Sequence, residues 1–134
     1  MNKIEHIGIA VKDIEQSNIL FAKLLNIQPY KMEAVESEGV ITSFFMLGDT
    51  KIELLQATNT ESAIAKFIEK KGEGIHHIAF AVDNAQQEIM RLLDNGIEMI
   101  HQIPKNGADN KLIAFAHPKS TGGVLMEICE EKSN

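Results

Sequence analysis

Hydrophobic and polar residues alternate in two separated stretches of the chain, IEHIGIAV at residues 4–11 and IHHIAFAV at residues 75–82. Such alternation over four to eight residues is typical of a half-buried strand. After each run the apolar residues recur with a helical period, which predicts helices over residues 14–26 and 85–96. The expected apolar stripes are Ile19, Leu20 and Leu24 in the first helix and Ile89, Leu92 and Leu93 in the second.

Two further strand-like runs follow the predicted helix in each half of the chain. They lie at residues 39–48, 50–56, 111–117 and 123–129. Between the halves, the sequence TESAIAKFIEKKGEG has the pattern of a short amphipathic helix closed by glycines. We therefore expect one domain made of module one (about residues 1–60), a linking helix (about 61–71) and module two (about 72–134).

The two halves repeat one another. Five residues of the first run, Ile4, His6, Ile7, Ala10 and Val11, recur in the second as Ile75, His77, Ile78, Ala81 and Val82. A shorter match pairs Glu53 in TKIELL with Glu127 in VLMEI. Internal repetition indicates two similar supersecondary units. Each unit carries one histidine and one glutamate at repeated positions, and these four residues are the candidates for chemistry.

Strand alternation separates the two adjacent histidines. Successive side chains of a strand point to opposite faces, so His77 shares a face with two alanines, and His6 shares a face with a glycine and an alanine. The large apolar residues of both strands must cover the helices, so His6 and His77 are expected to point away from the helix layer. His76 takes the position of Glu5 on the opposite face, where we expect a local structural role.

Glu53 and Glu127 both lie within apolar strands. An unpaired carboxylate is costly there, and a metal or a cationic partner makes its burial tolerable. The alternative is a glutamate paired on an exposed or edge face. If the two units pack with pseudo-twofold symmetry, one histidine and one glutamate from each converge. Two imidazoles and two carboxylates suit a divalent transition metal with positions left for water or substrate.

Composition and charge narrow the classes of function. The 13 Lys and Arg against 19 Asp and Glu give a net charge of −6, without the basic excess or the aromatic-rich basic stripe of a nucleic-acid binder. No uncharged stretch reaches the ~18 residues that span a bilayer, so we expect no membrane partner. The single cysteine, Cys129, cannot form an internal disulfide and fits a reducing compartment, so we expect a cytoplasmic protein.

Four phrases carry a resemblance to a known family: HIGIAV, LGDTKIELL, GEGIHHIAFAVD and HPKSTGGVLMEI. With their spacing they cover nearly the whole chain, which resembles the vicinal oxygen chelate superfamily of glyoxalase I, extradiol dioxygenases and antibiotic resistance proteins. The resemblance implies an α+β fold in which two βαβββ modules form a curled mixed sheet around a metal site. The last three phrases are similar, more narrowly, to those of methylmalonyl-CoA epimerases, which invert C2 of methylmalonyl-CoA through an enolate.

The resemblance also implies roles for individual residues. It implies metal ligation by His6, Glu53, His77 and Glu127, with Co²⁺ expected first and Ni²⁺, Mn²⁺ or Zn²⁺ as alternatives. Glu127 and Glu53 are the expected acid–base residues, because carboxylates on opposite sides of the reacting carbon suit proton removal and return. The sequence departs from part of the family at Thr42, where some epimerases carry a further glutamate proposed as a base.

A CoA thioester substrate also requires polar and cationic contacts, which a net acidic chain must supply locally. The loop HPKSTGG directly precedes the strand of Glu127, and its glycines allow a close approach of the backbone to a ligand. We expect His117, Lys119 and Ser120 of this loop, together with Thr42, to contact substrate. The resemblance further suggests a homodimer.

Two other functions stay open. Glyoxalase I uses a similar metal site to isomerise the glutathione hemithioacetal of methylglyoxal, and the shared ligands favour neither enzyme. A non-catalytic small-molecule-binding or resistance protein of the same fold is the second alternative. Resistance proteins of this superfamily lose the ligands, whereas all four are present here.

Overall fold

The computed structural model describes residues 1–133 and divides into two compact units. The first unit comprises residues 6–76, and the second comprises residues 1–5 together with the chain from His77 onward. The linking helix therefore belongs to the first unit. None of the helices in the described part of the chain combines the length and the hydropathy needed to cross a membrane.

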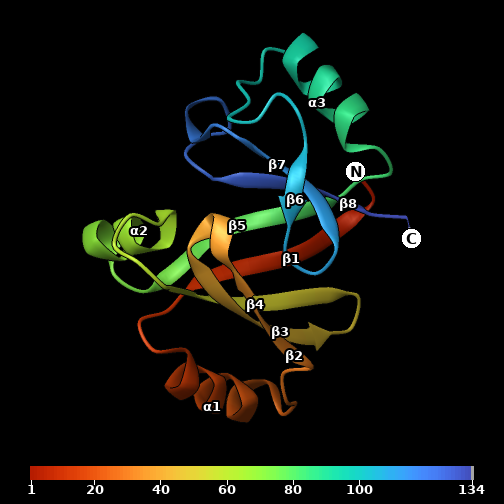
Figure 1. The fold of residues 1–134 in the computed structure, drawn as a ribbon. Helices are drawn as coiled ribbons and strands as arrows, with labels where there is room; N and C mark the ends of the chain where they lie inside the picture. The colour runs from red at the N-terminus through yellow and green to blue at the C-terminus, as the bar shows by residue number, and fades with distance from the viewer. Residues whose placement is uncertain (134) are drawn as a thin grey trace. The chain divides into compact units, whose positions relative to one another are not determined.

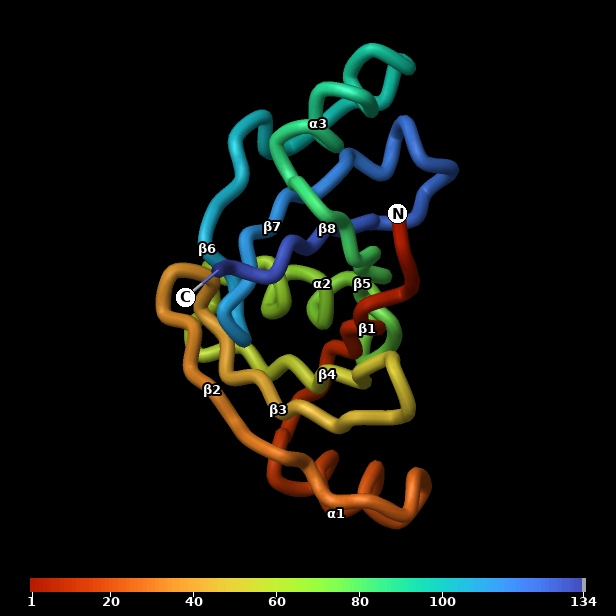
Figure 2. Tube along the Cα trace, turned by 90° about the vertical axis from the view of Figure 1, so that its right-hand side faces the viewer, coloured from red at the N-terminus to blue at the C-terminus, as the bar shows by residue number. Residues whose placement is uncertain are grey.

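Module one contains a helix and four strands, followed by the linking helix (Figure 1). Its elements are β1 (Lys3–Ala10), α1 (Ile14–Leu25), β2 (Lys31–Val35), a 3-10 helix (Glu36–Glu38), β3 (Val40–Leu47), β4 (Thr50–Ala57) and then α2 (Ala63–Lys71). β1 pairs in parallel with β4, whereas β3 pairs antiparallel with both β2 and β4. Figure 2 shows β2, β3 and β4 side by side, with α1 next to them.

Module two repeats this arrangement. Its elements are β5 (Gly74–Ala81), α3 (Ala85–Asp94), β6 (Lys105–Gly107), β7 (Lys111–Ala116), a 3-10 helix (Pro118–Ser120) and β8 (Met126–Glu131). β5 pairs in parallel with β8, and β7 pairs antiparallel with both β8 and β6. The strand order is β2-β3-β4-β1 within module one and β5-β8-β7-β6 within module two, so each module contributes four neighbouring strands. The predicted α+β fold with two βαβββ modules and a mixed sheet is confirmed.

The sequence pattern does not predict β2 or β6 as strands. β2 reads KMEAV and is exposed or half-buried throughout, and β6 is the three-residue stretch KNG. Neither has the alternation that marks a strand with one buried face. β8 also begins at Met126 rather than at the expected Gly123, because Gly122 and Gly123 have positive φ angles and belong to the preceding turn.

Each helix begins at a polar cap. The Asp13 side chain accepts hydrogen bonds from the backbone N–H groups of the first turn of α1, and Asn84 and Ser62 cap α3 and α2 in the same way. These caps satisfy N–H groups that have no partner within the helix. They mark where each helix starts.

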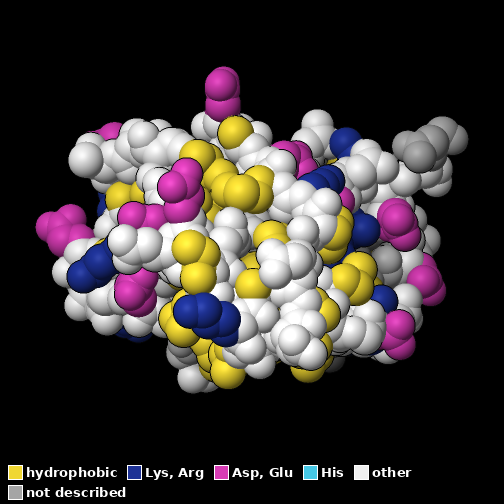
Figure 3. Space-filling view, turned by 90° about the horizontal axis from the view of Figure 1, so that it is seen from below, with side chains coloured by type: hydrophobic (Ala, Val, Ile, Leu, Met, Phe, Trp, Pro, Cys, Tyr) yellow, Lys and Arg dark blue, Asp and Glu magenta, His cyan; other side chains and the backbone are white. Residues whose placement is uncertain are grey.

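The expected apolar stripe of α1 is wrong. Ile14 is buried with Phe45 and Leu54, and Phe21, Ala22 and Leu25 pack against the same cluster. Ile19, Leu20 and Leu24 instead are exposed, Leu24 to 69%. The helix carries apolar residues on more than one side, and the side that starts at the capped Ile14 faces the sheet. Figure 3 views the molecule from the α1 side, where hydrophobic side chains gather between charged ones.

Module two packs α3 against one face of its strands. The cluster there consists of Val82, Ala85, Ile89, Met99, Ala114, Ala116 and Ile128, with Leu92 and Ile97 at its edge. Ile89 and Leu92 are therefore in the expected stripe, whereas Leu93 is exposed. At about 100° per residue, Leu93 is turned about 40° from Ile89 on the side away from Leu92, so it lies at the edge of the buried face.

Candidate functional site

Module one buries a histidine–glutamate pair on one face of its strands. In the parallel pairing of β1 with β4, Gly8 lies opposite Glu53 and His6 lies opposite Lys51. His6 and Glu53 are therefore diagonal neighbours with side chains on the same face. His6 Nδ1 lies 3.1 Å from Glu53 Oε2, and both side chains are buried.

Two neighbours accommodate this pair. Gly8 has no side chain, so it leaves space on the strand beside the Glu53 carboxylate. Lys51 is buried and lies on the same face by its register with His6. A buried ammonium group offsets part of the cost of burying a carboxylate. This face of module one thus combines a nitrogen donor, a carboxylate and a cation.

Module two buries a second pair with the same local geometry. Ala79 of β5 lies opposite Glu127 of β8, and His77 Nε2 lies 3.3 Å from Glu127 Oε1. In each module the histidine precedes by two positions the small residue that faces the glutamate. His77, the second of the two adjacent histidines, is the one that lies beside Glu127.

The surroundings of Ala79 differ from the expected open face. Ile113, Cys129 and Phe115 pack against Ala79 on the side opposite α3. The cause is the register of β7, which brings Ile113 opposite Cys129 and Phe115 opposite Glu127. Large side chains of β7 therefore reach the face that the small residues of β5 leave free.

Phe115 is a neighbour of His77 that the sequence pattern does not single out. Its ring meets the His77 imidazole edge to face, with centroids 5.4 Å apart. The backbone N–H of Phe115 donates a hydrogen bond to His101 Nδ1 at 3.1 Å, and the two rings are 5.9 Å apart. Phe115 lies next to Glu127 because of the register between β7 and β8. The alternation of residues in β7 alone does not predict that register.

His76 has the local role that the alternation predicts. Its ring packs edge to face against Phe67 of α2, with centroids 5.0 Å apart. Glu5, which corresponds to His76 in the repeat, differs from the expectation. It is buried, and its carboxylate lies within 4.8 Å of Cys129 Sγ.

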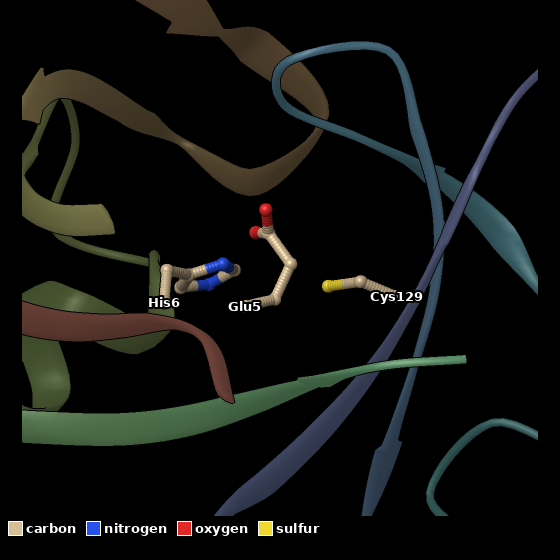
Figure 4. A group of neighbouring side chains, drawn as sticks. All are labelled: Glu5, His6 and Cys129. Carbon is tan, nitrogen blue, oxygen red and sulfur yellow. The ribbon is translucent and has the colours of Figure 1, made fainter. Parts of the chain in front are cut away.

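Figure 4 shows the Cys129 thiol directed toward the Glu5 side chain. Cys129 lies two positions after Glu127 on β8, so both side chains are on the same face. Glu5 therefore does not pack against an apolar helix, where its carboxylate would lose hydration without compensation. Glu5 and His6, successive residues of β1, are both buried.

The loop between β7 and β8 holds three of the residues expected to contact substrate. His117 Nδ1 accepts a hydrogen bond from the backbone N–H of Lys119, and Ser120 Oγ accepts one from the N–H of Glu98. Ser120 Oγ also donates to the carbonyl of His117. His117 and Ser120 thus stabilise the loop, whereas Lys119 is exposed. Contacts of these residues with a substrate stay a prediction.

Thr42, the fourth residue expected to contact substrate, lies in the middle of β3. It is 1% exposed, opposite Leu55 on β4 and Glu33 on β2. Phe44, two positions later, lies opposite Glu53. Thr42 therefore shares the face of the His6–Glu53 pair.

Each pair, taken by itself, offers donors that divalent transition metals accept. Each offers an imidazole nitrogen and a carboxylate oxygen from buried side chains, and ions such as Co²⁺, Ni²⁺ and Zn²⁺ accept this donor set. The residues present therefore fit the metal that the resemblance implies. The same carboxylates, held beside imidazoles and away from bulk water, also suit proton transfer.

Comparisons with known proteins agree with this arrangement. The family model "Glyoxalase/Bleomycin resistance protein/Dioxygenase superfamily" matches residues 5–115. A solved structure of a hypothetical protein from Bacillus halodurans C-125 is 44% identical with a TM-score of 0.95, covering 99% of this chain and 96% of that one. The human mitochondrial methylmalonyl-CoA epimerase is 36% identical, covering 96% of this chain and 73% of the human protein.

A further solved structure contains a ligand. It is a variant of Streptomyces coelicolor methylmalonyl-CoA epimerase in complex with 2-nitronate-propionyl-CoA, 29% identical with a TM-score of 0.93, covering 99% of this chain and 96% of that one. The family match spans most of the chain, and the human relative is 36% identical over 96% of this chain. The chain belongs to the glyoxalase/bleomycin resistance protein/dioxygenase superfamily.

Proposed function

We propose that the protein is a metal-dependent epimerase that interconverts the two C2 stereoisomers of methylmalonyl-CoA. The observation that carries the proposal is the repeated buried pair, His6 with Glu53 and His77 with Glu127. Relatives named as methylmalonyl-CoA epimerases, at 36% and 29% identity over nearly all of this chain, support the choice of reaction.

In this proposal the four paired residues supply the ligands of one divalent ion. Co²⁺ is the first choice, and Ni²⁺, Mn²⁺ or Zn²⁺ suit the same donors. When bound, such an ion stabilises negative charge on the thioester oxygen and the carboxylate oxygen of the substrate. His6 and His77 contribute neutral imidazole nitrogens.

The two glutamates carry the proton transfers. One carboxylate removes the C2 proton from one face of the substrate, which leaves an enolate, and the conjugate acid of the other returns a proton to the opposite face. Glu127 and Glu53 are the proposed pair, because each is buried within about 3 Å of an imidazole that can hold its orientation. One proton leaves and one returns, so the reaction is redox-neutral.

The substrate is a CoA thioester, and the S. coelicolor relative that binds a CoA analogue supports this part of the proposal. Lys119 is exposed on the loop before β8 and is the proposed cationic contact, with His117 and Ser120 shaping that loop. A homodimer in the cytoplasm completes the proposal.

The test is an isotope experiment with cobalt-loaded protein and one stereoisomer of methylmalonyl-CoA in D₂O. We expect inversion at C2 together with incorporation of deuterium there. The His77→Ala variant should lose both activities, whereas His76→Ala, which removes a ring contact with Phe67 and no proposed metal ligand, should keep them.

Two results would replace this function. Turnover of the glutathione hemithioacetal of methylglyoxal, without deuterium at C2 of methylmalonyl-CoA, would favour the glyoxalase I reaction. Failure of purified protein to take up cobalt or nickel would favour a non-catalytic binding protein.

A further inference from the structure

The hydroxyl group of Thr42 is buried, and within residues 1–133 it has no hydrogen-bond partner. Thr42 is 1% exposed, and its Oγ1 atom contacts no donor or acceptor among the described residues. Buried hydroxyl groups are nearly always paired, because an unpaired one loses its hydrogen bonds to water without replacement. An unpaired hydroxyl in an otherwise closely packed strand therefore requires an explanation.

The next residue along β3 provides a matched contrast. Ser43 is as deeply buried as Thr42, and its hydroxyl donates a hydrogen bond to Asn18 Oδ1 of α1. Successive residues of a strand face opposite sides, so Ser43 points to the α1 side and Thr42 points away from it. In the part of the chain that the structure describes, the hydroxyl on the α1 side thus has a hydrogen-bond partner, and the hydroxyl on the other side has none.

The side that Thr42 faces is that of the His6–Glu53 pair. Thr42 lies opposite Leu55, and Glu53 is the diagonal neighbour on β4, a separation of about 7–8 Å between positions. On the other neighbour strand, Glu33 lies opposite Thr42 and forms an ion pair with Lys31 at 3.3 Å. Thr42 is thus the neutral polar residue between two carboxylates.

This position determines what the hydroxyl can bind. The Glu53 carboxylate can only accept hydrogen bonds, and its negative charge repels an anionic oxygen of a ligand. Thr42 Oγ1 instead can donate a hydrogen bond and carries no charge. A threonine hydroxyl is also too weakly acidic or basic to exchange a proton with carbon at neutral pH, so its role is binding and not proton transfer.

We propose that Thr42 Oγ1 donates a hydrogen bond to an oxygen of the bound substrate and so positions its acyl group beside Glu53. In this hydrogen bond Thr42 Oγ1 is the donor, and the substrate oxygen is the acceptor. The inference rests on the proposed function for the identity of the ligand, a malonyl-type CoA thioester, and it adds a residue that selects and orients that acyl group.

The proposal predicts opposite effects on stability and on binding. Thr42→Val keeps the shape of the side chain and removes the unpaired hydroxyl, so the ligand-free protein should unfold at the same or a higher temperature. The same variant should bind methylmalonyl-CoA about ten-fold more weakly, because one hydrogen bond to the ligand is lost. A residue with only a structural role would not combine these two effects.

The experiment measures thermal unfolding without ligand and calorimetric binding of methylmalonyl-CoA to the metal-loaded protein. Thr42→Ser should bind within about two-fold of the natural protein, because it keeps the hydroxyl. Ser43→Ala should lower the unfolding temperature and leave the affinity unchanged, because it removes the hydrogen bond to Asn18.

The outcomes separate this inference from the proposed function. If the natural protein binds methylmalonyl-CoA and Thr42→Val binds it equally well, the role of Thr42 is overturned and the epimerase proposal stands. If Thr42→Val unfolds at a clearly lower temperature, the hydroxyl has a structural partner and the inference is wrong. If the natural protein does not bind this CoA ester at all, the proposed function and the inference fall together.

Discussion

Gly8 lies directly opposite Glu53 in the parallel pairing of β1 with β4, and this register leaves the Glu53 carboxylate free to lie 3.1 Å from His6 Nδ1. Ala79 has the same relationship to Glu127 in module two. Directly opposed side chains on neighbouring strands are in contact, so a large residue at either position would compete with the glutamate for space. The small residue is therefore a requirement of each pair.

This requirement predicts the effect of a larger side chain at Ala79. Ala79 is fully buried with Ile113 and Cys129, so Ala79→Leu should lower the free energy of unfolding by about 1–3 kcal/mol through overpacking. It should also weaken metal binding, because the new side chain separates His77 from Glu127. Urea denaturation and a cobalt titration measure the two effects.

The exposed Ile75 on the same strand offers a control for this experiment. Ile75→Ala should change the free energy of unfolding by no more than about 0.5 kcal/mol and leave metal affinity intact. A folded Ala79→Leu protein with normal cobalt affinity would show that the small residue is not needed.

Glu127→Gln separates metal binding from proton transfer. The amide keeps an oxygen donor but cannot accept the C2 proton, so kcat should fall by about 10²- to 10⁴-fold. Deuterium incorporation at C2 should fall in parallel. Glu131→Gln, at an exposed position of the same strand, is the matched control and should keep full activity. Equal rates for both variants would remove Glu127 from the proposed acid–base pair.

The exposed apolar residues of α1 should tolerate substitution by polar residues with little loss of stability. Leu24→Gln should change the free energy of unfolding by no more than about 0.5 kcal/mol, because Leu24 is 69% exposed. Ile14→Ala should cost about 2–5 kcal/mol, because Ile14 is buried against Phe45 and Leu54. Chemical denaturation of both variants tests this. A large loss from Leu24→Gln would mean that another copy of the chain covers this helix face in solution.

The cap of α1 predicts a further stability effect. Asp13 accepts hydrogen bonds at 3.1 Å from the N–H groups of Glu15 and Gln16, so Asp13→Ala should lower the free energy of unfolding by about 1 kcal/mol. Asp13→Asn retains an acceptor and should recover most of this loss. Equal stability of the alanine variant and the natural protein would show that the cap is unimportant for α1.

Strand alternation is enough to predict that His77 and His76 face opposite sides of β5, because a period of two follows from backbone geometry alone. It was not enough to predict that Phe115 meets His77, because this contact depends on the register of β7 with β8. The helical period likewise locates α1 but not its buried side, since apolar residues surround much of that helix. The internal repeat contributed most to the site, because it identified both buried pairs before any register was known.

The measurement that tests the central claim most directly is the stoichiometry of metal binding by elemental analysis of the natural protein and of the single variants His6→Ala and His77→Ala. If the two buried pairs hold one ion together, the natural protein contains one cobalt ion per chain and each variant loses it. Two ions per chain, or a variant that retains its metal after loss of one histidine, would contradict a single shared site.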